Sequence, residues 1–163
     1  MVDLDGAYVS DENIVELSAE HMGVDGPFYN TESGTIETKD IPSIIDRNDR
    51  KRKNLEYLIS LSDTGIKIGT KTIPYEIYYF SSNLDHFINH DANMNKPKRF
   101  MADKFVRKYG LDPDDFCKFF FEDSASIGHL GYRESWEEIK KGINSVKRFT
   151  NIDCLIRRLL DTV

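Results

Sequence analysis

One apolar run constrains the fold of this chain more than any other segment. Residues 72–82 read TIPYEIYYFSS, and most of the run is β-branched or aromatic. A near-continuous run of this kind is typical of a strand that is buried on both faces, and Pro74 must lie at its start because proline cannot donate to a central ladder. Such a strand needs a layer of helices on each side, so the sequence predicts an α/β protein.

Helical patterns occupy most of the remaining chain. Pro42 fits the first position of a long helix, which the Asp-Thr-Gly sequence at residues 63–65 ends. From residue 83 onward the apolar residues recur at helical spacing, and Pro97 fits the start of one of these helices. The second half of the chain is therefore predicted to be mostly helical.

The first forty residues carry weaker signals. Residues 2–5 predict the end of a short buried strand. Ser10 fits an N-cap, and the acids and apolar residues after it predict a helix over residues 11–22. Residues 23–40 are rich in glycine, serine, threonine and acids, so they predict a loop or an irregular hairpin.

Together these segments predict one α/β domain over residues 1–163. We expect a small central, partly parallel sheet flanked by helices over residues 1–90, followed by a mostly helical part over residues 91–163. Apolar residues make up 39% of the chain and charged residues 31%, which is typical of a soluble globular protein. No run is long and apolar enough for a membrane span, and the two distant cysteines predict free thiols in a reducing cytoplasm.

Two aspartates follow the first predicted strand. Asp3 and Asp5 stand one residue apart before Gly6 in VDLDG. Residues i and i+2 of a strand point to the same side, so the two carboxylates repel each other unless a cation lies between them. Mg²⁺ keeps several waters, so two carboxylates and a substrate phosphate suffice to hold it. The pattern predicts a metal site, and an exposed aspartate-rich turn is the alternative.

A second polar cluster follows the long apolar strand. Ser82 and Asn83 stand where this strand runs into a helix, and Asp85 falls in the first helical turn. Ligands bind at the carboxyl ends of strands in open α/β sheets, so Ser82 and Asn83 are predicted to bind phosphate and Asp85 to be a further acid of the site. Stabilisation of the helix dipole is the alternative for Asp85. His86 and His90 share a helix face as a zinc pair would, but they lack the glutamate of an HExxH motif.

The third cluster is the basic segment RNDRKRKN at residues 47–54. The chain has a net charge of −6, yet residues 47–108 carry +6. On a helix, Arg47, Arg50 and Lys51 share one face, and Arg50, Lys53 and Asn54 share another. Such a row suits the phosphates of a nucleic-acid backbone, and Arg50 and Lys53 are the residues predicted to bind them. Residues 47–54 are therefore a candidate nucleic-acid surface, and the solvated side of an amphipathic helix is the alternative.

The order of the three clusters resembles a Toprim-like domain of the RloB and abortive-infection type, which occurs in bacterial defence. In such proteins a strand ends in Asp-x-Asp, a basic helix follows, and a later buried strand runs into a Ser-Asn-x-acid helix start. The matching segments here are Asp3-Leu4-Asp5, residues 47–54 and Ser82-Asn83-Leu84-Asp85. The resemblance covers residues 2–90, and it implies that Asp3, Asp5 and Asp85 hold Mg²⁺ and catalyse phosphodiester cleavage, with Arg50 and Lys53 on the nucleic-acid backbone.

The chain departs from this family at its beginning. Toprim proteins also use a glutamate from an earlier strand as a general acid/base, and no residue before Met1 is present to supply it. We therefore expect either a chain truncated at its N-terminus or an incomplete, inactive site. In the inactive case the protein is a non-catalytic interaction or regulatory module, which binds a protein partner or forms a homodimer.

A second family shares the first motif. The segment DLDGAYV looks like the first motif of haloacid-dehalogenase-like phosphatases, which would make Asp3 the nucleophile and Asp5 the acid/base. Ser62 in LISLS imitates the second motif of that family, and Lys67 or Lys71 imitates its lysine. However, Ser62 falls at the end of a predicted helix, whereas the family places this residue at a strand end. A phosphatase of this kind is the second alternative.

Overall fold

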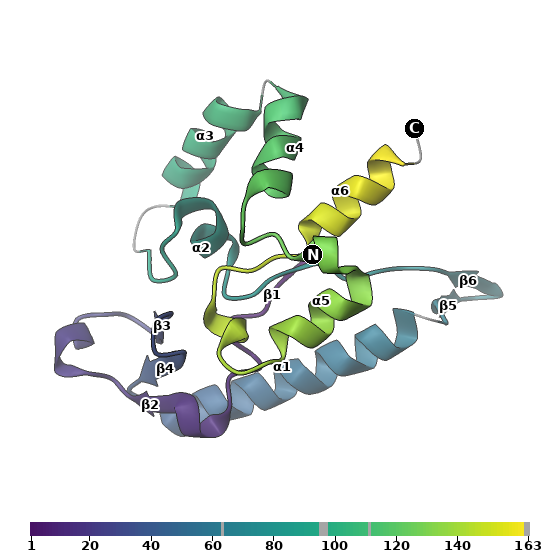
Figure 1. The fold of residues 1–163 in the computed structure, drawn as a ribbon. Coiled ribbons are helices and arrows are strands. Elements are labelled where there is room, and N and C mark those ends of the chain that lie inside the picture. Colours follow the sequence, from purple (N-terminus) through teal and green to yellow (C-terminus); the bar gives the residue numbers. More distant parts are fainter. Residues whose placement is uncertain (63, 95–97, 111, 162–163) are drawn as a thin grey trace.

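The computed structural model describes residues 1–62, 64–94, 98–110 and 112–161, and it has an α/β fold with small sheets and a helical C-terminal half (Figure 1). The helices are α1 (Ile41–Ser62), α2 (Leu84–Asn89), α3 (Lys98–Tyr109), α4 (Pro113–Glu122), α5 (Tyr132–Ile139) and α6 (Ile152–Leu160). The strands are β1 (Val2–Asp3), β2 (Ile14–Glu16), β3 (Phe28–Asn30), β4 (Thr35–Thr38), β5 (Ile66–Ile68), β6 (Lys71–Ile73) and β7 (Tyr79–Phe80). The short 3₁₀ helices are η1 (Asp11–Asn13), η2 (Ala19–His21), η3 (Gly128–Leu130) and η4 (Asn144–Val146). The predicted fold class is confirmed.

The central sheet is the parallel pair β1–β7. Asp3 lies opposite Phe80, and the pairing continues beyond both strands because the Asp5 N–H donates to the Ser82 carbonyl at 2.8 Å. On the other side of β7, Thr150 forms an antiparallel bridge to Phe80. The carboxyl ends of β1 and β7 therefore lie side by side, as the sequence predicts for a partly parallel sheet.

The predicted long strand is shorter than its apolar run. Residues 71–73 form β6, which pairs with β5 in an exposed hairpin, and only residues 79–80 form β7. The strand is interrupted after Ile73, next to Pro74. On the side of β7 that faces away from β1, side chains form the hydrogen bonds to the Tyr79 main chain that a neighbouring strand would otherwise form. The Tyr79 N–H donates to Asn151 Oδ1 at 2.9 Å, and Thr150 Oγ1 donates to the Tyr79 carbonyl at 2.6 Å. The prediction of burial is nevertheless confirmed, because residues 77–80 are all buried.

Helices cover both faces of this sheet. On one face Leu4 and Tyr79 pack against α1 and α5 in a core that includes Leu55, Trp136 and Ile139. The opposite face packs against α2, α4 and α6 in a second core, whose buried members include Phe80, Phe87, Phe120 and Ile156. Residues from the C-terminal part thus complete both cores around the β1–β7 pair.

The predicted helix over residues 11–22 is wrong. After the short η1, residues 14–16 form β2, which pairs in parallel with β4, and β3 pairs with β4 from the other side. This pairing buries Ile14 beside Ile36 in a third core with Val9, Tyr29 and Val146. Contacts distant in sequence therefore override the local helical pattern. The predicted irregular hairpin over residues 23–40 is formed by β3 and β4.

The remaining predictions for single positions have mixed outcomes. Helix α1 includes Pro42 in its first turn and ends at Ser62 as predicted. Asp63 and Pro97, which were predicted to end one helix and begin another, lie outside the described residues. Cys117 and Cys154 are half-buried free thiols. Within the described ranges, no helix combines the length and the apolar character that crossing a membrane requires.

Candidate functional site at the carboxyl end of β1

The two aspartates of VDLDG flank the end of β1. Asp3 is the last residue of the strand, and Asp5 and Gly6 turn the chain with φ angles of 49° and 68°. Aspartate is one of the few side chains that tolerates this left-handed region, and glycine adopts it without strain. A Cβ at Gly6 would also lie 2.9 Å from Ile36 Cδ1, so the Ile36 side chain would have to shift to accept it. The turn therefore needs the Asp-Gly order that the sequence provides.

Helix α1 holds the peptide groups of this turn. The side chain of Asn48 is fully buried, and its Nδ2 donates to the Gly6 carbonyl at 3.3 Å. Arg47 Nη2 donates to the Asp5 carbonyl at 2.9 Å and to Asn48 Oδ1 at 2.9 Å. Because these donors come from one helix, the position of the turn is fixed to that of α1.

The site combines two carboxylates with two cations and a phenol. Lys51 Nζ lies 2.5 Å from Asp5 Oδ2, and Arg47 Nη1 donates to the Tyr29 hydroxyl at 3.3 Å. Burial raises the pKa of Tyr29; the Arg47 charge opposes this shift, and the negative charges of Asp5 and Asp3 add to it. The negative charges of both carboxylates thus act on one phenol.

Asp85 occupies a different position from the other two predicted metal ligands. It lies in the first turn of α2 and lines a cavity of about 570 Å³ whose wall also includes Asp3, but not Asp5. Among the residues that the structure describes, no three His, Cys, Asp or Glu side chains are grouped as a metal site would need. The structure therefore places Asp3 and Asp85 in the wall of one cavity and Asp5 outside that wall, and Mg²⁺ binding stays a prediction.

The predicted phosphate ligands Ser82 and Asn83 have partners inside the protein. Ser82 is buried, and its hydroxyl pairs with Nδ1 of the buried His86. Asn83 caps α2 by accepting from the His86 N–H at 2.7 Å, and its Nδ2 donates to the Ala92 carbonyl at 3.2 Å. Both side chains thus hold the start of α2 beside the end of β7, and a direct contact with phosphate stays a prediction.

The residues of the basic helix α1 that reach the site are not the two predicted to bind phosphate. Arg50 is exposed and pairs with Asp46 one turn earlier, and Lys53 is also exposed. Arg47 and Lys51 instead turn toward the carboxyl end of β1. The missed signal is the position of the buried residues of α1, which include Asn48 and Leu55. Helical periodicity places Lys51 on their side of the helix and Arg47 at the border of that side, whereas Arg50 and Lys53 lie on the opposite side.

The two histidines of α2 do not form a metal pair. His86 is buried beside Ser82, whereas His90 is exposed and ends the helix with a φ of 61°. Burial is the main cause that lowers the pKa of His86 from 6.5 to about 4, and the Arg148 charge adds to it. The His86 imidazole is therefore neutral at pH 7 and serves as a structural partner of the Ser82 hydroxyl.

This low pKa predicts that acid destabilises the fold. The unfolded chain protonates His86 near pH 6.5 and the folded chain only near pH 4, so the stabilisation present above pH 6.5 is lost as the pH falls toward 4. We expect the free energy of unfolding to decrease by about 2–3 kcal/mol between pH 7 and pH 4 through this group. Urea unfolding of the wild type and of His86→Gln checks this, with His90→Gln as the exposed control. An identical pH dependence in wild type and His86→Gln contradicts it.

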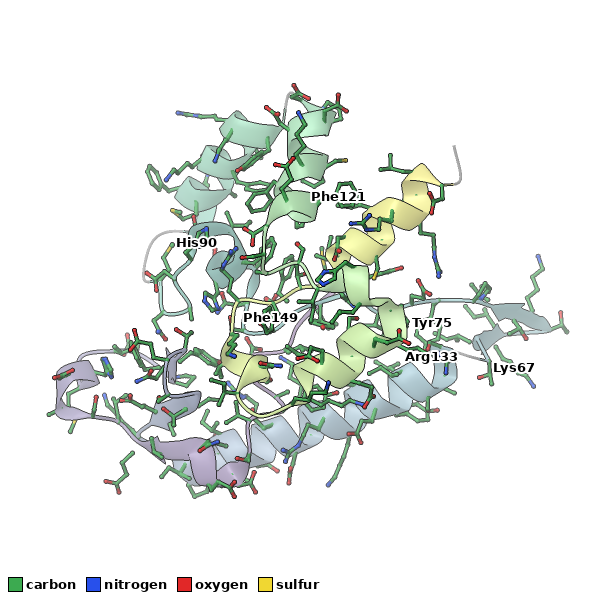
Figure 2. All side chains as sticks on the ribbon, in the orientation of Figure 1. Lys67, Tyr75, His90, Phe121, Arg133 and Phe149 are labelled. Carbon is green, nitrogen blue, oxygen red and sulfur yellow. The ribbon has the colours of Figure 1, made fainter. Side chains whose placement is uncertain are left out.

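The residues that imitate phosphatase motifs lie elsewhere. Ser62 ends α1, and its hydroxyl donates to the Ile59 carbonyl at 2.6 Å. Lys67 and Lys71 belong to the exposed β5–β6 hairpin, and Figure 2 shows Lys67 projecting at the side of the molecule, away from β1. The strand beside Asp3 ends instead at Ser81 and Ser82, so these serines are the hydroxyls that stand at a parallel strand end.

Comparison of the chain with protein-family models, with curated proteins and with solved structures gives no match in any of the three.

Proposed function

We propose that this protein is a Mg²⁺-dependent phosphoester hydrolase with its reaction centre at the carboxyl end of β1. The observation that carries the proposal is the placement of Asp3 and Asp5 at the end of a strand that pairs in parallel with the buried β7, with Lys51 and Arg47 in contact with Asp5. Ligand sites of α/β sheets form at such strand ends. Carboxylates and cations together suit a metal-bound phosphate better than either charge alone.

The donor set fits Mg²⁺ in type and in sign. Mg²⁺ prefers oxygen ligands and is usually held by one or two carboxylates together with water and substrate phosphate. The Asp5 carboxylate forms an ion pair with the ammonium group of Lys51, so it is a group that binds a positive charge in this structure. We propose that Asp3 and Asp5 would hold the Mg²⁺ ion, with Asp85 in the neighbouring cavity wall.

The proposed reaction is hydrolysis of the bond between phosphorus and the alcohol oxygen. Water adds its oxygen to phosphorus, and the alcohol leaves with a proton. Bound Mg²⁺ would neutralise the negative charge of the phosphoryl group. Lys51 would bind a phosphoryl oxygen, and Arg47 positions the turn by holding the Asp5 carbonyl.

The second candidate is a phosphatase that forms an aspartyl phosphate. One observation favours it: Ser82 stands at the end of the strand parallel to β1, and its carbonyl accepts from the Asp5 N–H. In this route Asp3 attacks phosphorus, the alcohol takes a proton from Asp5, and water then cleaves the acyl phosphate. A Toprim-like enzyme acts on phosphodiesters, whereas this phosphatase acts on monoesters, so the substrate separates the two candidates.

The test combines Mg²⁺ binding with two chromogenic substrates. We expect Mg²⁺ to shift the backbone amide signals of residues 3–6 in an NMR titration, and Ca²⁺ to serve as the comparison ion. Hydrolysis of p-nitrophenyl phosphate or of bis(p-nitrophenyl) phosphate is expected with Mg²⁺ and not with EDTA. The absence of both a shift at residues 3–6 and hydrolysis of either ester rejects the proposal and favours the non-catalytic interaction module.

A further inference from the structure

The cavity beside Asp3 has the size and lining of a small-molecule site. Its volume is about 570 Å³, and its lining residues come from β1, β7, α2, α3, α4 and α6, the elements labelled in Figure 1. Apolar side chains form most of its wall, including Phe105, Phe116, Phe120 and Ile156. Ligand pockets of 300–1,000 Å³ with mainly apolar walls are typical of small-molecule binding.

Several wall residues expose apolar surface that a ligand would cover. Val106 is 61% exposed, Leu159 58%, Leu84 40% and Phe116 37%, and all four line this one cavity. These residues come from four different helices. Their exposure is therefore not explained by the end of a single helix that extends into solvent. Exposed apolar surface that several helices contribute to one cavity indicates a binding site.

The charges in the wall restrict what can enter. Of the described side chains that line the cavity, only those of Asp3 and Asp85 carry a formal charge, and Met1 is also among the lining residues. Most of the remaining wall is apolar, so it offers few polar partners to a second charged group. The cavity wall therefore favours an uncharged, apolar part of a substrate.

Asp3 connects this cavity with the proposed reaction centre. It ends β1 opposite Phe80, which is itself part of the cavity wall, and its carboxylate also acts on the Tyr29 phenol beside Asp5 and Lys51. A phosphate ester held at Asp3 would therefore have this apolar cavity directly beside it. The alcohol part of the ester would then face the apolar wall.

We infer that the substrate is the phosphate monoester of an apolar alcohol, whose hydrocarbon part binds in the cavity between α3, α4 and α6. This inference rests on the proposed function. Each methylene group buried in the cavity contributes favourable transfer free energy, so kcat/KM should rise about threefold to fourfold for each added methylene.

The experiment measures Mg²⁺-dependent phosphate release from ethyl, butyl and hexyl phosphate. For the wild-type protein we expect kcat/KM to increase about 100-fold from ethyl to hexyl phosphate. Val106→Asp places a charge on the cavity wall and should remove most of this increase. Phe100→Asp is the matched control, because Phe100 is 59% exposed on the same helix but does not line the cavity.

Each outcome separates the inference from the proposed function. Equal kcat/KM for the three esters, or an equal chain-length dependence in Val106→Asp, overturns the inference and leaves the hydrolase proposal standing. No phosphate release from any ester, including p-nitrophenyl phosphate, overturns both. Sedimentation of the wild type as a dimer that Val106→Asp dissociates shows that a second copy covers the cavity, and this result also overturns the inference.

Discussion

Replacing Asp3 by asparagine is expected to lower kcat/KM for phosphoester hydrolysis about 1000-fold, which corresponds to about 4 kcal/mol of lost transition-state stabilisation. Asparagine keeps the shape of the side chain but removes the charge that both proposed routes need, either to hold Mg²⁺ or to attack phosphorus. The side chain is exposed at the end of β1, so the fold should tolerate the change. The measurement is steady-state hydrolysis at saturating Mg²⁺, with the near-ultraviolet circular dichroism spectrum recorded for both proteins.

A matched control separates this effect from a general loss of negative charge. Asp25 is an exposed acid in the loop between η2 and β3, and Asp25→Asn should keep wild-type activity. Asp3→Asn should also lose the Mg²⁺-induced amide shifts at residues 3–6. Wild-type activity in Asp3→Asn would show that the carboxyl end of β1 is not the reaction centre.

Replacing Arg148 by methionine is expected to lower the free energy of unfolding by about 3–5 kcal/mol. Arg148 donates to both carboxylate oxygens of Asp123, at 2.9 Å and 2.6 Å, and to the Phe87 carbonyl at 3.0 Å. The two side chains of the ion pair are only 16% and 14% exposed. Methionine fills similar space, but it leaves the Asp123 charge buried without its partner, and that residual charge causes most of the loss.

A double-mutant cycle tests this explanation by urea unfolding. Asp123→Asn removes the buried charge while keeping the acceptor for the Ala125 N–H. The double variant Arg148→Met/Asp123→Asn should therefore be more stable than Arg148→Met alone. The exposed pair Arg50–Asp46 supplies the comparison, because Arg50→Met should change stability little. Equal losses in Arg148→Met and Arg50→Met would refute the role assigned to burial.

The parts of the fold that sequence predicts are those encoded within one segment. The apolar run at residues 77–80 indicates burial on two faces, and Pro42 with the pattern after it indicates α1, because each signal depends on neighbouring residues alone. The second sheet could not be predicted in this way. Ile14 becomes part of a strand only because β4, twenty residues later, offers it a parallel partner beside Ile36.

The candidate site shows the same division. The Asp-x-Asp-Gly order indicates a strand end followed by a tight turn, and the structure places Asp3 and Asp5 there. The cations of the site depend on how α1 is rotated against β1, and this rotation is set by tertiary packing of Asn48 and Leu55. Local sequence therefore indicates a basic helix but does not indicate that Lys51, rather than Lys53, faces the carboxylates.

The far side of β7 has a consequence for behaviour at high concentration. An open strand edge is a template on which a strand of another molecule can add, and repeated addition leads to aggregates. Here the main-chain groups of Tyr79 are already occupied by the Asn151 amide and the Thr150 hydroxyl. The edge of this apolar strand is thus covered by side chains of its own chain, which prevents pairing with a strand of another molecule. Strand β7 can therefore be as hydrophobic as the core requires without promoting aggregation.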